Sequence, residues 1–506
     1  MVLERACVAL LSLGLALSAS ARATAQTSAK KKSAGAAKKA PAGAVRRAPV
    51  AKPFNARKTS SKKGGAKLAR GKARGHVTVA SVRAPVAIAH AAPPEVYAPG
   101  AVPVEGREAA ITRITESLAS QRMGIEGAAN LQPFFDQLRA LETDPTSGVV
   151  RILQFGDSHT ASDTFTGPMR TLFQNKFGDG GAGYSYPGYP FAGYKIHGTR
   201  RAQSTGWTIT GTHFRDLGDG LLGMGGVSLS TAQPGNWISL DADATSLEVQ
   251  YLVEPDGGDI DIYDGEQLLQ HVSTAGPTAA GHFDTPVQAG PHHFEVRTTS
   301  DAPVRLFGMV TEQAAGVTYE SMGLNGAEAG LILHWNEVLQ QELMAQRDIA
   351  LIVLAYGTNE ASDSNWTEEG YAAMFKSLIE RCRRLAPKAA ILVLGPADRE
   401  LRSGTRRHVA WTPYSGIDRI VRAQRSVCRA MGCAYWDERS RMGGFGAMRE
   451  WVQVGWGQGD HTHFTGEGYN ELAAALFSDI VHEYNAYEHA DGVGTVANKG
   501  AGGGAR

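Results

Sequence analysis

Three long runs of branched apolar residues constrain the fold of this 506-residue chain more than any other feature. They are VVRILQF (149–155), DIALIVLAYG (348–357) and AAILVLG (389–395). Runs without polar alternation are typical of strands that are covered on both faces, as in a parallel sheet. Segments with the apolar spacing of helices lie between and after them, so strands alternate with helices along the chain. This order predicts an α/β fold with a doubly wound parallel sheet in three layers.

Five helices and a fourth strand complete the expected α/β pattern. The helices are expected near 164–177, 326–345, 367–385, 415–431 and 466–486, and the strand at 433–437.

Residues 198–312 interrupt this pattern. The stretch contains many short candidate strands, among them TSLEVQYLVE (245–254) and HHFEVRTT (292–299), separated by Gly, Pro and Asp. Turn signals at intervals of about 8–12 residues predict an antiparallel β-sandwich. Because α/β elements lie on both sides, we expect this β domain to be an insertion into the α/β domain. Its aromatic side chains, such as Trp207, Tyr251 and Tyr263, are expected to pack in its core, with stacking on sugar rings as the alternative.

The N-terminus has the features of a secretory signal peptide. A positive residue, Arg5, precedes an apolar run (6–17), and Ala23-Thr24-Ala25 forms a small-residue cleavage site. We therefore expect residues 1–25 to be removed and the mature chain to be secreted or periplasmic. The apolar run is shorter than a bilayer requires and no later run reaches that length, so no transmembrane segment is expected in the mature chain.

The segment from 26 to 105 is basic and poor in large apolar residues. Residues 26–94 contain 17 Lys and Arg but no Asp or Glu. Such a segment cannot bury enough surface to offset its ordering entropy, so a disordered arm is expected. It is either a tether to an anionic polymer of the cell envelope or a solvated spacer. Its scarcity of aromatic residues argues against a nucleic-acid partner that would be bound by base stacking.

Three cysteines, Cys382, Cys428 and Cys433, remain after removal of the signal peptide. In an oxidising compartment we expect one disulfide and one free thiol, with three buried thiols as the alternative. Their spacing matches no zinc site, and no metal or cofactor is expected. The expected order of segments is signal peptide 1–25, basic arm 26–105, α/β domain 106–197, β insertion 198–312, α/β domain 313–490 and flexible tail 491–506.

Four short segments at expected strand ends carry chemically useful groups. Ser158, in FGDSHTASD (155–163), follows the first apolar strand, while Gly323 and Asn359 lie at the ends of two further strands. Because the carboxyl ends of parallel strands lie at one edge of a sheet, we expect these residues to lie close together. They supply a hydroxyl nucleophile, a backbone N–H that no side chain covers and an amide donor for an oxyanion.

The fourth segment supplies a candidate base. Asp460 and His463 lie three residues apart in GDHTHFTGEGY (459–469), before the last expected helix. At this spacing the carboxylate can orient the imidazole and stabilise its charged form. His461 is a second candidate for the base. Together the four segments supply the groups that acyl transfer needs, although each alone is a weak signal.

These segments resemble the four blocks of the SGNH (GDSL-type) hydrolases, named for their Ser, Gly, Asn and His. The resemblance implies that Ser158 is the nucleophile and that Asp460 and His463 form its base system. It implies an oxyanion hole made by the backbone N–H groups of Ser158 and Gly323 and the amide of Asn359. The run DHTHFTGEGY is similar to the family ending D-x-x-H-[LF]-T-x-x-G-Y.

Two further features resemble bacterial peptidoglycan O-acetylesterases: His159 replaces the Leu of G-D-S-L, and a carbohydrate-binding-like β domain follows the nucleophile block. The resemblance implies a secreted serine esterase that removes acyl groups, in this case acetyl, from an O-acylated polysaccharide. Asp157 is expected to be structural, and His159 to pack, with a position lining the site as the alternative. The alternatives are a lipase or lysophospholipase, a polysaccharide O-acetyltransferase, and a non-catalytic wall-binding protein.

Overall fold

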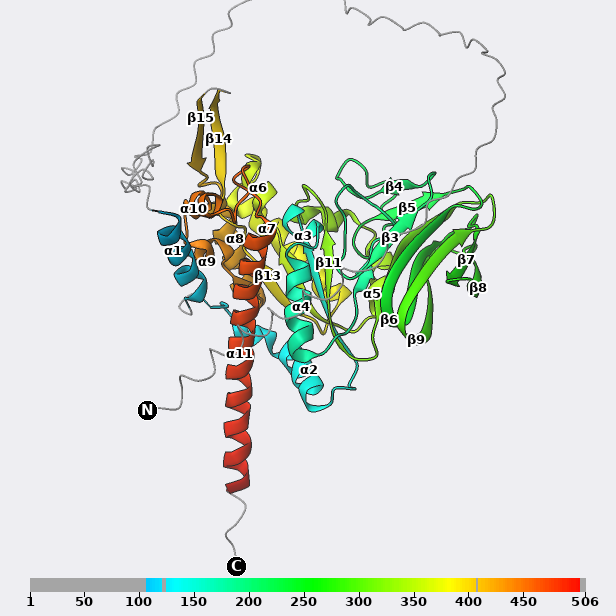
Figure 1. Cartoon of the computed structure of the whole chain (residues 1–506), viewed down its shortest axis with the longest axis horizontal. Helices are drawn as coiled ribbons and strands as arrows, with labels where there is room; N and C mark the ends of the chain where they lie inside the picture. The colour runs from blue at the N-terminus through cyan, green and yellow to red at the C-terminus, as the bar shows by residue number, and fades with distance from the viewer. Residues whose placement is uncertain (1–105, 121–123, 406–407, 501–506) are drawn as a thin grey trace, which may run out of the picture. The chain divides into compact units, whose positions relative to one another are not determined.

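The computed structural model describes residues 106–120, 124–405 and 408–500, with the backbone alone from residue 490. The predicted signal peptide (1–25) and the predicted basic arm (26–105) both precede the first described residue. The described residues form a parallel sheet covered by helices and a larger antiparallel sheet (Figure 1). No helix in this part of the chain is both long and apolar enough to cross a membrane.

The parallel sheet has five strands in the order β11-β1-β12-β13-β16. Their bounds are β1 (Val149–Gly156), β11 (Gly316–Gly323), β12 (Ile349–Ala355), β13 (Ala390–Leu394) and β16 (Ala434–Trp436). Numbered along the chain, this is the order 2-1-3-4-5 of a doubly wound fold, which confirms the predicted fold class. In such folds the ligand crevice lies where the strand order reverses, here at the carboxyl ends of β1 and β12.

Helices cover both faces of this sheet. Successive residues of β1 pack on opposite sides, with Ile152 in one core and Leu153 in the other. Helices α2 (Gln132–Thr143), α4 (Thr166–Phe177) and α11 (Gly466–Gly500) belong to the first side, and α7 (Glu368–Leu385) and α8 (Ile417–Met431) to the second (Figure 1). Burial on both faces explains why the strand sequences lack polar alternation.

The remaining helices pack around these layers. Helix α1 (Arg107–Ala119) contacts α9 (Glu438–Met442) and α10 (Ala447–Val454), and α5 (Glu337–Ala345) contacts α7 and the antiparallel sheet. Two 3₁₀ turns, η2 (Ala128–Leu131) and η3 (Ala329–His334), and two short helices, α3 (Ser158–Ala161) and α6 (Thr358–Ser362), complete this part.

Helix α11 is longer than the sequence predicted. A helix near 466–486 and a flexible tail from 491 were expected, but the backbone stays helical to Gly500. The expected helix end is therefore wrong. Extending an existing helix requires no new nucleus, so even a polar and glycine-containing segment can continue it.

The inserted β domain is one antiparallel sheet of nine strands. Its strands are β2 (Gly183–Ser185), β3 (Arg200–Gln203), β4 (Thr208–Thr210), β5 (Ser228–Thr231), β6 (Trp237–Val253), β7 (Asp259–Asp264), β8 (Gln267–Ser273), β9 (Ala279–Thr298) and β10 (Val304–Glu312). The predicted antiparallel insertion is present, but hydrogen bonds join all its strands, whereas a sandwich has two separate sheets. The long strand β6 explains this, because its first half pairs with β3 and its second half with β10.

The insertion also begins earlier in the chain than predicted. Strand β2 pairs with β10, so the sheet includes residues before the expected boundary at 198. Of the three aromatic residues named from the sequence, Tyr251 is buried in the core of the sheet, which fits the expected packing role, whereas Trp207 and Tyr263 are only partly buried.

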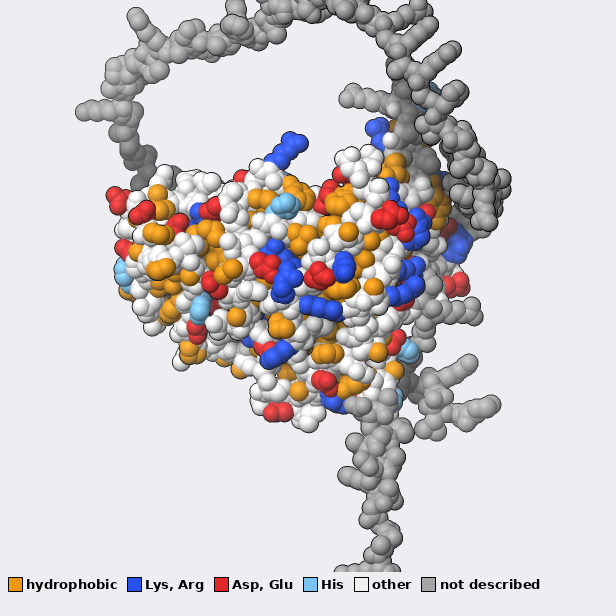
Figure 2. Space-filling model, turned by 180° about the vertical axis from the view of Figure 1, so that it is seen from behind, with side chains coloured by type: hydrophobic (Ala, Val, Ile, Leu, Met, Phe, Trp, Pro, Cys, Tyr) orange, Lys and Arg blue, Asp and Glu red, His pale blue; other side chains and the backbone are white. Residues whose placement is uncertain are grey.

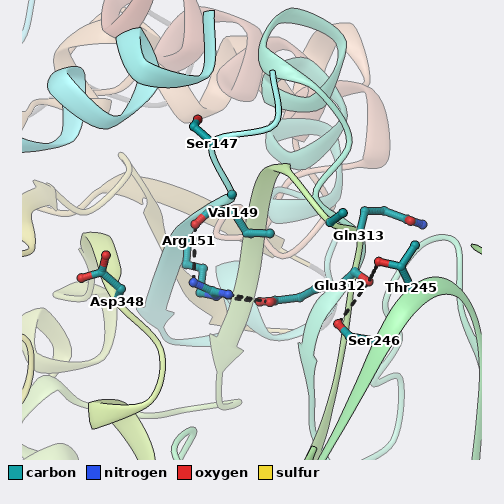
Figure 3. Close-up of a pocket in the computed structure, with 10 residues that line it drawn as sticks. Ser147, Val149, Arg151, Thr245, Ser246, Glu312, Gln313 and Asp348 are labelled. Atoms are coloured by element: carbon teal, nitrogen blue, oxygen red, sulfur yellow. Dashed lines mark hydrogen bonds and ion pairs between the residues drawn. The ribbon is translucent and has the colours of Figure 1, made fainter. Parts of the chain in front are cut away.

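A network of ion pairs joins the insertion to the amino end of the parallel sheet. Arg347 pairs with Glu320 of β11 at 2.6 Å and with Glu312 of β10 at 2.8 Å. Arg151 of β1 reaches the other oxygen of Glu312 at 2.7 Å. Figure 3 shows Arg151 and Glu312 facing each other in a pocket of about 620 Å³ at this end. The charges that line this pocket are thus already matched.

Opposite charges are also matched on the outer surface. Figure 2 shows acidic and basic side chains interspersed on the face turned away in Figure 1. Examples of exposed pairs are Arg384 with Glu337 and Arg422 with Glu368.

The three cysteines do not form the expected disulfide. Cys382, Cys428 and Cys433 are all free and buried, which corresponds to the alternative of three buried thiols.

Candidate active site

The register of the parallel sheet brings three of the sequence segments to one edge. Gly156, the last residue of β1, is aligned with Gly323 of β11 on one side and with Ala355 of β12 on the other. Ser158 follows the first of these strand ends and Asn359 follows the last. The predicted convergence of these segments therefore has a direct cause in strand pairing.

Ser158 lies at the start of α3, directly after β1. Asp157 caps this helix, because its Oδ1 accepts the backbone N–H of His159 at 2.9 Å. Gly156 is required at the turn, since a Cβ there would collide with the side chain of Thr160. Burial raises the pKa of Asp157 to about 6. The contacts of Asp157 agree with the structural role expected for it.

The Ser158 hydroxyl meets the ring of His463, which lies 305 residues later in the chain. The distance from Oγ to Nε2 is 2.8 Å. On the other side of the ring, Nδ1 lies 2.6 Å from Oδ2 of Asp460. An ionised carboxylate only accepts, so Nδ1 carries the proton and Nε2 is free to accept the Ser158 hydroxyl.

Asp460 is held by its own loop. Its Oδ1 accepts the backbone N–H groups of Thr462 and His463, each at 3.0 Å. Partial burial opposes ionisation, but the hydrogen bonds from the His463 side chain and from these backbone groups outweigh it and lower the pKa of Asp460. The carboxylate is therefore ionised at neutral pH. The side chains of His463 and Asp460 keep 32% and 48% of their surface exposed, so the pair is accessible from solvent.

The second candidate base, His461, points elsewhere. Its Nδ1 lies 2.6 Å from Oε2 of Glu400, and its ring stacks on Trp411 with a centroid distance of 3.9 Å. His461 adopts a left-handed backbone conformation with φ of 54°, which turns its side chain away from that of His463. The structure therefore does not bring His461 to Ser158.

The partners of His461 belong to a hairpin that the sequence analysis missed. It consists of β14 (Glu400–Thr405) and β15 (His408–Pro413). Arg449 also pairs with the buried carboxylate of Glu400, at 2.6 Å. The hairpin thus anchors the loop that carries Asp460 and His463. Strand β14 is mostly polar and almost wholly exposed, and no residue of β15 is buried, so the hairpin lacks the long apolar run by which the other strands were found.

Gly323 and Asn359 flank the nucleophile. A Cβ on Gly323 would collide with the backbone of Ala161 in α3, so only glycine allows this approach. Asn359 lies in α6, and its Nδ2 donates a hydrogen bond to the carbonyl of Ala327 at 2.9 Å. This bond uses one amide hydrogen and leaves the second for another acceptor.

The ring of His159 makes a stacking contact and a polar contact at this site. Its ring stacks on that of His463 with a centroid distance of 5.0 Å, and its Nδ1 lies 3.0 Å from the hydroxyl of Tyr469. Simple packing was the role expected for this residue from the sequence. The histidine that stands here in place of the leucine of G-D-S-L was the signal that could have indicated a polar contact.

A hydroxyl, an imidazole and a carboxylate linked in series on an α/β sheet form the arrangement used for ester hydrolysis. This fold and site are those of an SGNH-type carboxylic ester hydrolase. Residues 278–470 match the family of GDSL-like lipases and acylhydrolases, which supports this class of enzyme.

Solved structures extend this comparison. A peptidoglycan O-acetylesterase is 25% identical and has a TM-score of 0.62, with 72% of this chain and 99% of that chain covered. A family two carbohydrate esterase from Clostridium thermocellum, in complex with cellohexaose, is 15% identical with a TM-score of 0.25, covering 55% of this chain and 99% of its own. That TM-score is too low to support an argument. No curated protein matches the sequence.

Proposed function

We propose that the protein is an exported serine esterase that removes acetyl groups from an O-acetylated cell-wall polysaccharide. Ser158 is the nucleophile, His463 the general base and acid, and Asp460 the group that orients His463. The observation that carries the proposal is the continuous contact from Ser158 Oγ to His463 Nε2, at 2.8 Å, and from His463 Nδ1 to Asp460, at 2.6 Å.

The first half of the reaction forms an acyl-enzyme. The Ser158 oxygen attacks the ester carbonyl while His463 Nε2 takes the hydroxyl proton. Asp460 stabilises the resulting imidazolium. The backbone N–H groups of Ser158 and Gly323 and the free amide hydrogen of Asn359 donate to the oxyanion. His463 then gives its proton to the sugar oxygen, which leaves as a hydroxyl while the acetyl group stays on Ser158.

The second half returns the enzyme to its starting state. A water molecule attacks the acetyl carbonyl and gives its proton to His463. The same donors stabilise the second oxyanion. Its collapse breaks the bond to Ser158, whose oxygen takes back the proton from His463, and acetate leaves. The partial exposure of His463 and Asp460 supports access of both the polymer and water.

Two observations support a cell-wall polysaccharide as the substrate. The structural match to a peptidoglycan O-acetylesterase covers 99% of that protein and 72% of this chain. The predicted signal peptide supports export, and the basic segment 26–94 would favour an anionic envelope polymer.

The test compares substrates. The purified protein is incubated with O-acetylated peptidoglycan and with O-acetylated xylan, and released acetate is measured. We expect faster release from peptidoglycan, and no release by Ser158→Ala. Equal or faster release from xylan would contradict the peptidoglycan assignment, and release by Ser158→Ala at the normal rate would contradict the mechanism.

Two further measurements separate the remaining activities. A series of chromogenic esters with longer acyl chains should show declining turnover, whereas a lipase would prefer the longer chains. Addition of an acceptor glycan should leave free acetate as the product, whereas a transferase would acetylate the glycan.

A further inference from the structure

The residue after the nucleophile joins the two halves of the candidate active site. His159 belongs to α3, together with Ser158, but its ring contacts only the segment that carries the base. It stacks on His463, at a centroid distance of 5.0 Å and an interplanar angle of 30°. It also contacts the rings of Phe464 and Tyr469, at 5.8 Å and 6.0 Å.

A hydrogen bond fixes the orientation of the His159 ring. Its Nδ1 lies 3.0 Å from the hydroxyl of Tyr469, which belongs to the first turn of α11. Rotation of the ring about its side-chain bonds would break this bond, so the face presented to His463 is held in one orientation. The nucleophile helix and the helix after the base loop are thereby linked through one imidazole.

The ring of His159 stays uncharged at neutral pH. Burial lowers the pKa of His159 to about 3, and the nearby His463 and Arg399 act in the same direction against the opposing effect of Asp460. During the reaction His463 becomes an imidazolium. An uncharged aromatic ring beside it avoids the repulsion that a second cation would produce.

We propose that His159 is a positioning residue, whose imidazole, held by Tyr469, sets the plane of the His463 ring and keeps Nε2 directed at Ser158. This inference rests on the proposed function. Small displacements of a base are costly, since about 1 Å of misplacement can lower turnover by about 100-fold. Loss of the Tyr469 bond allows the rings to tilt rather than separate, so a roughly tenfold loss is expected.

The test uses His159→Phe, Tyr469→Phe and the double variant. His159→Phe keeps a ring of similar size without the hydrogen bond, and Tyr469→Phe removes only the hydroxyl. Each should lower kcat on a chromogenic acetate roughly tenfold with KM unchanged, because the base is displaced and the substrate contacts are not. The double variant should be no worse than either single variant, since both remove the same bond.

Tyr484→Phe is the matched control in the same helix. Its hydroxyl bonds to Glu142 and Glu488, away from the site, so this variant should change thermal stability but not kcat. A wild-type kcat in Tyr469→Phe, or additive losses in the double variant, would overturn the positioning role. If His159→Phe fails to fold, Tyr469→Phe still decides the question. Undiminished turnover by Ser158→Ala would instead refute the proposed function itself.

Discussion

Both ends of the parallel sheet carry charged side chains, but the contacts that these side chains make differ between the two ends. At the amino end, Arg347 and Arg151 share Glu312, and Arg347 also binds Glu320, so every charge has an opposite partner. At the carboxyl end, Ser158 and His463 are linked in series and remain partly open to solvent. The amino end has the features of a structural junction, and the carboxyl end has groups still available to a substrate.

Two buried carboxyl groups, one at each end, show this difference in their pKa values. At the amino end, Glu312 is buried, yet the attraction of Arg347 and Arg151 outweighs burial and lowers its pKa. At the carboxyl end, burial raises the pKa of Glu360 to about 8, and one of its oxygens has no partner among the described residues. We therefore expect substitutions in the ion pairs of the amino end to alter stability, and substitutions of Ser158 or Asn359 to alter mainly turnover.

The largest effect is expected for Ser158→Ala. Removal of the nucleophile should lower kcat by about a million-fold, as for a serine enzyme that loses a member of its triad. Because only one oxygen is removed from a partly exposed side chain, the melting temperature should change little. Hydrolysis of a chromogenic acetate and a thermal melt measure the two quantities. Residual turnover above one per cent of wild type would show that another group attacks the ester.

Arg347→Met should have the next largest effect, at the opposite end of the sheet. It leaves Glu320 buried without its cation, so the free energy of unfolding should fall by about 3–5 kcal/mol. The kcat per folded molecule should stay unchanged. Urea unfolding and a titration of active molecules test this. Lys388→Met is the matched control, because its pair with Asp348 is exposed and should contribute less than about 1 kcal/mol.

Asn359→Ala should lower kcat by about 100- to 1000-fold, the usual cost of one oxyanion donor. Its bond to Ala327 O is also lost, so a small loss of stability should accompany the change. Asn365→Ala, at an exposed position in the loop that follows α6, is the control and should leave kcat unchanged. A change in KM alone for Asn359→Ala would argue against oxyanion stabilisation.

The last prediction concerns the pH dependence of stability and Glu360→Gln, and its effect is the smallest when measured over a single pH unit. The pKa of Glu360 in the folded protein, about 8, lies above its ordinary value of 4.5, so the folded state retains a proton that the unfolded chain has released. Stability should therefore fall as pH rises between these values, by up to about 1.4 kcal/mol per pH unit. Glu360→Gln should lack this contribution. Parallel pH slopes for both proteins in urea unfolding would contradict the shift.

The parallel sheet could be predicted because the apolar pattern of each strand lies within a few consecutive residues. The runs that became β12 and β13 are apolar throughout, and that of β1 contains only Arg151 and Gln154 as polar residues, since both faces of each strand are covered. The fold class and the class of enzyme were confirmed. The register of β1 and β11 places Gly323 close to Ser158. The sequence indicates this proximity only indirectly, because its segments resemble those of a known family.

Contacts between distant and exposed residues could not be predicted. The choice between His461 and His463 depends on Glu400 and Trp411, which lie in a hairpin without an apolar pattern. The single sheet of the insertion depends on the pairing of β6 along its whole length, which short candidate strands do not indicate. The catalytic roles of the site residues remain a prediction that the proposed variants test.

Ser158 and His463 are separated by 305 positions in the sequence, and this separation determines when a growing chain can acquire the proposed activity. Ser158 is synthesised early, and the whole β insertion follows it before His463 is made. A partly synthesised chain that ends before residue 463 therefore contains the hydroxyl without the imidazole that the proposed mechanism requires. Under that mechanism, newly made molecules stay inert toward esters until almost all of the described α/β domain has been assembled.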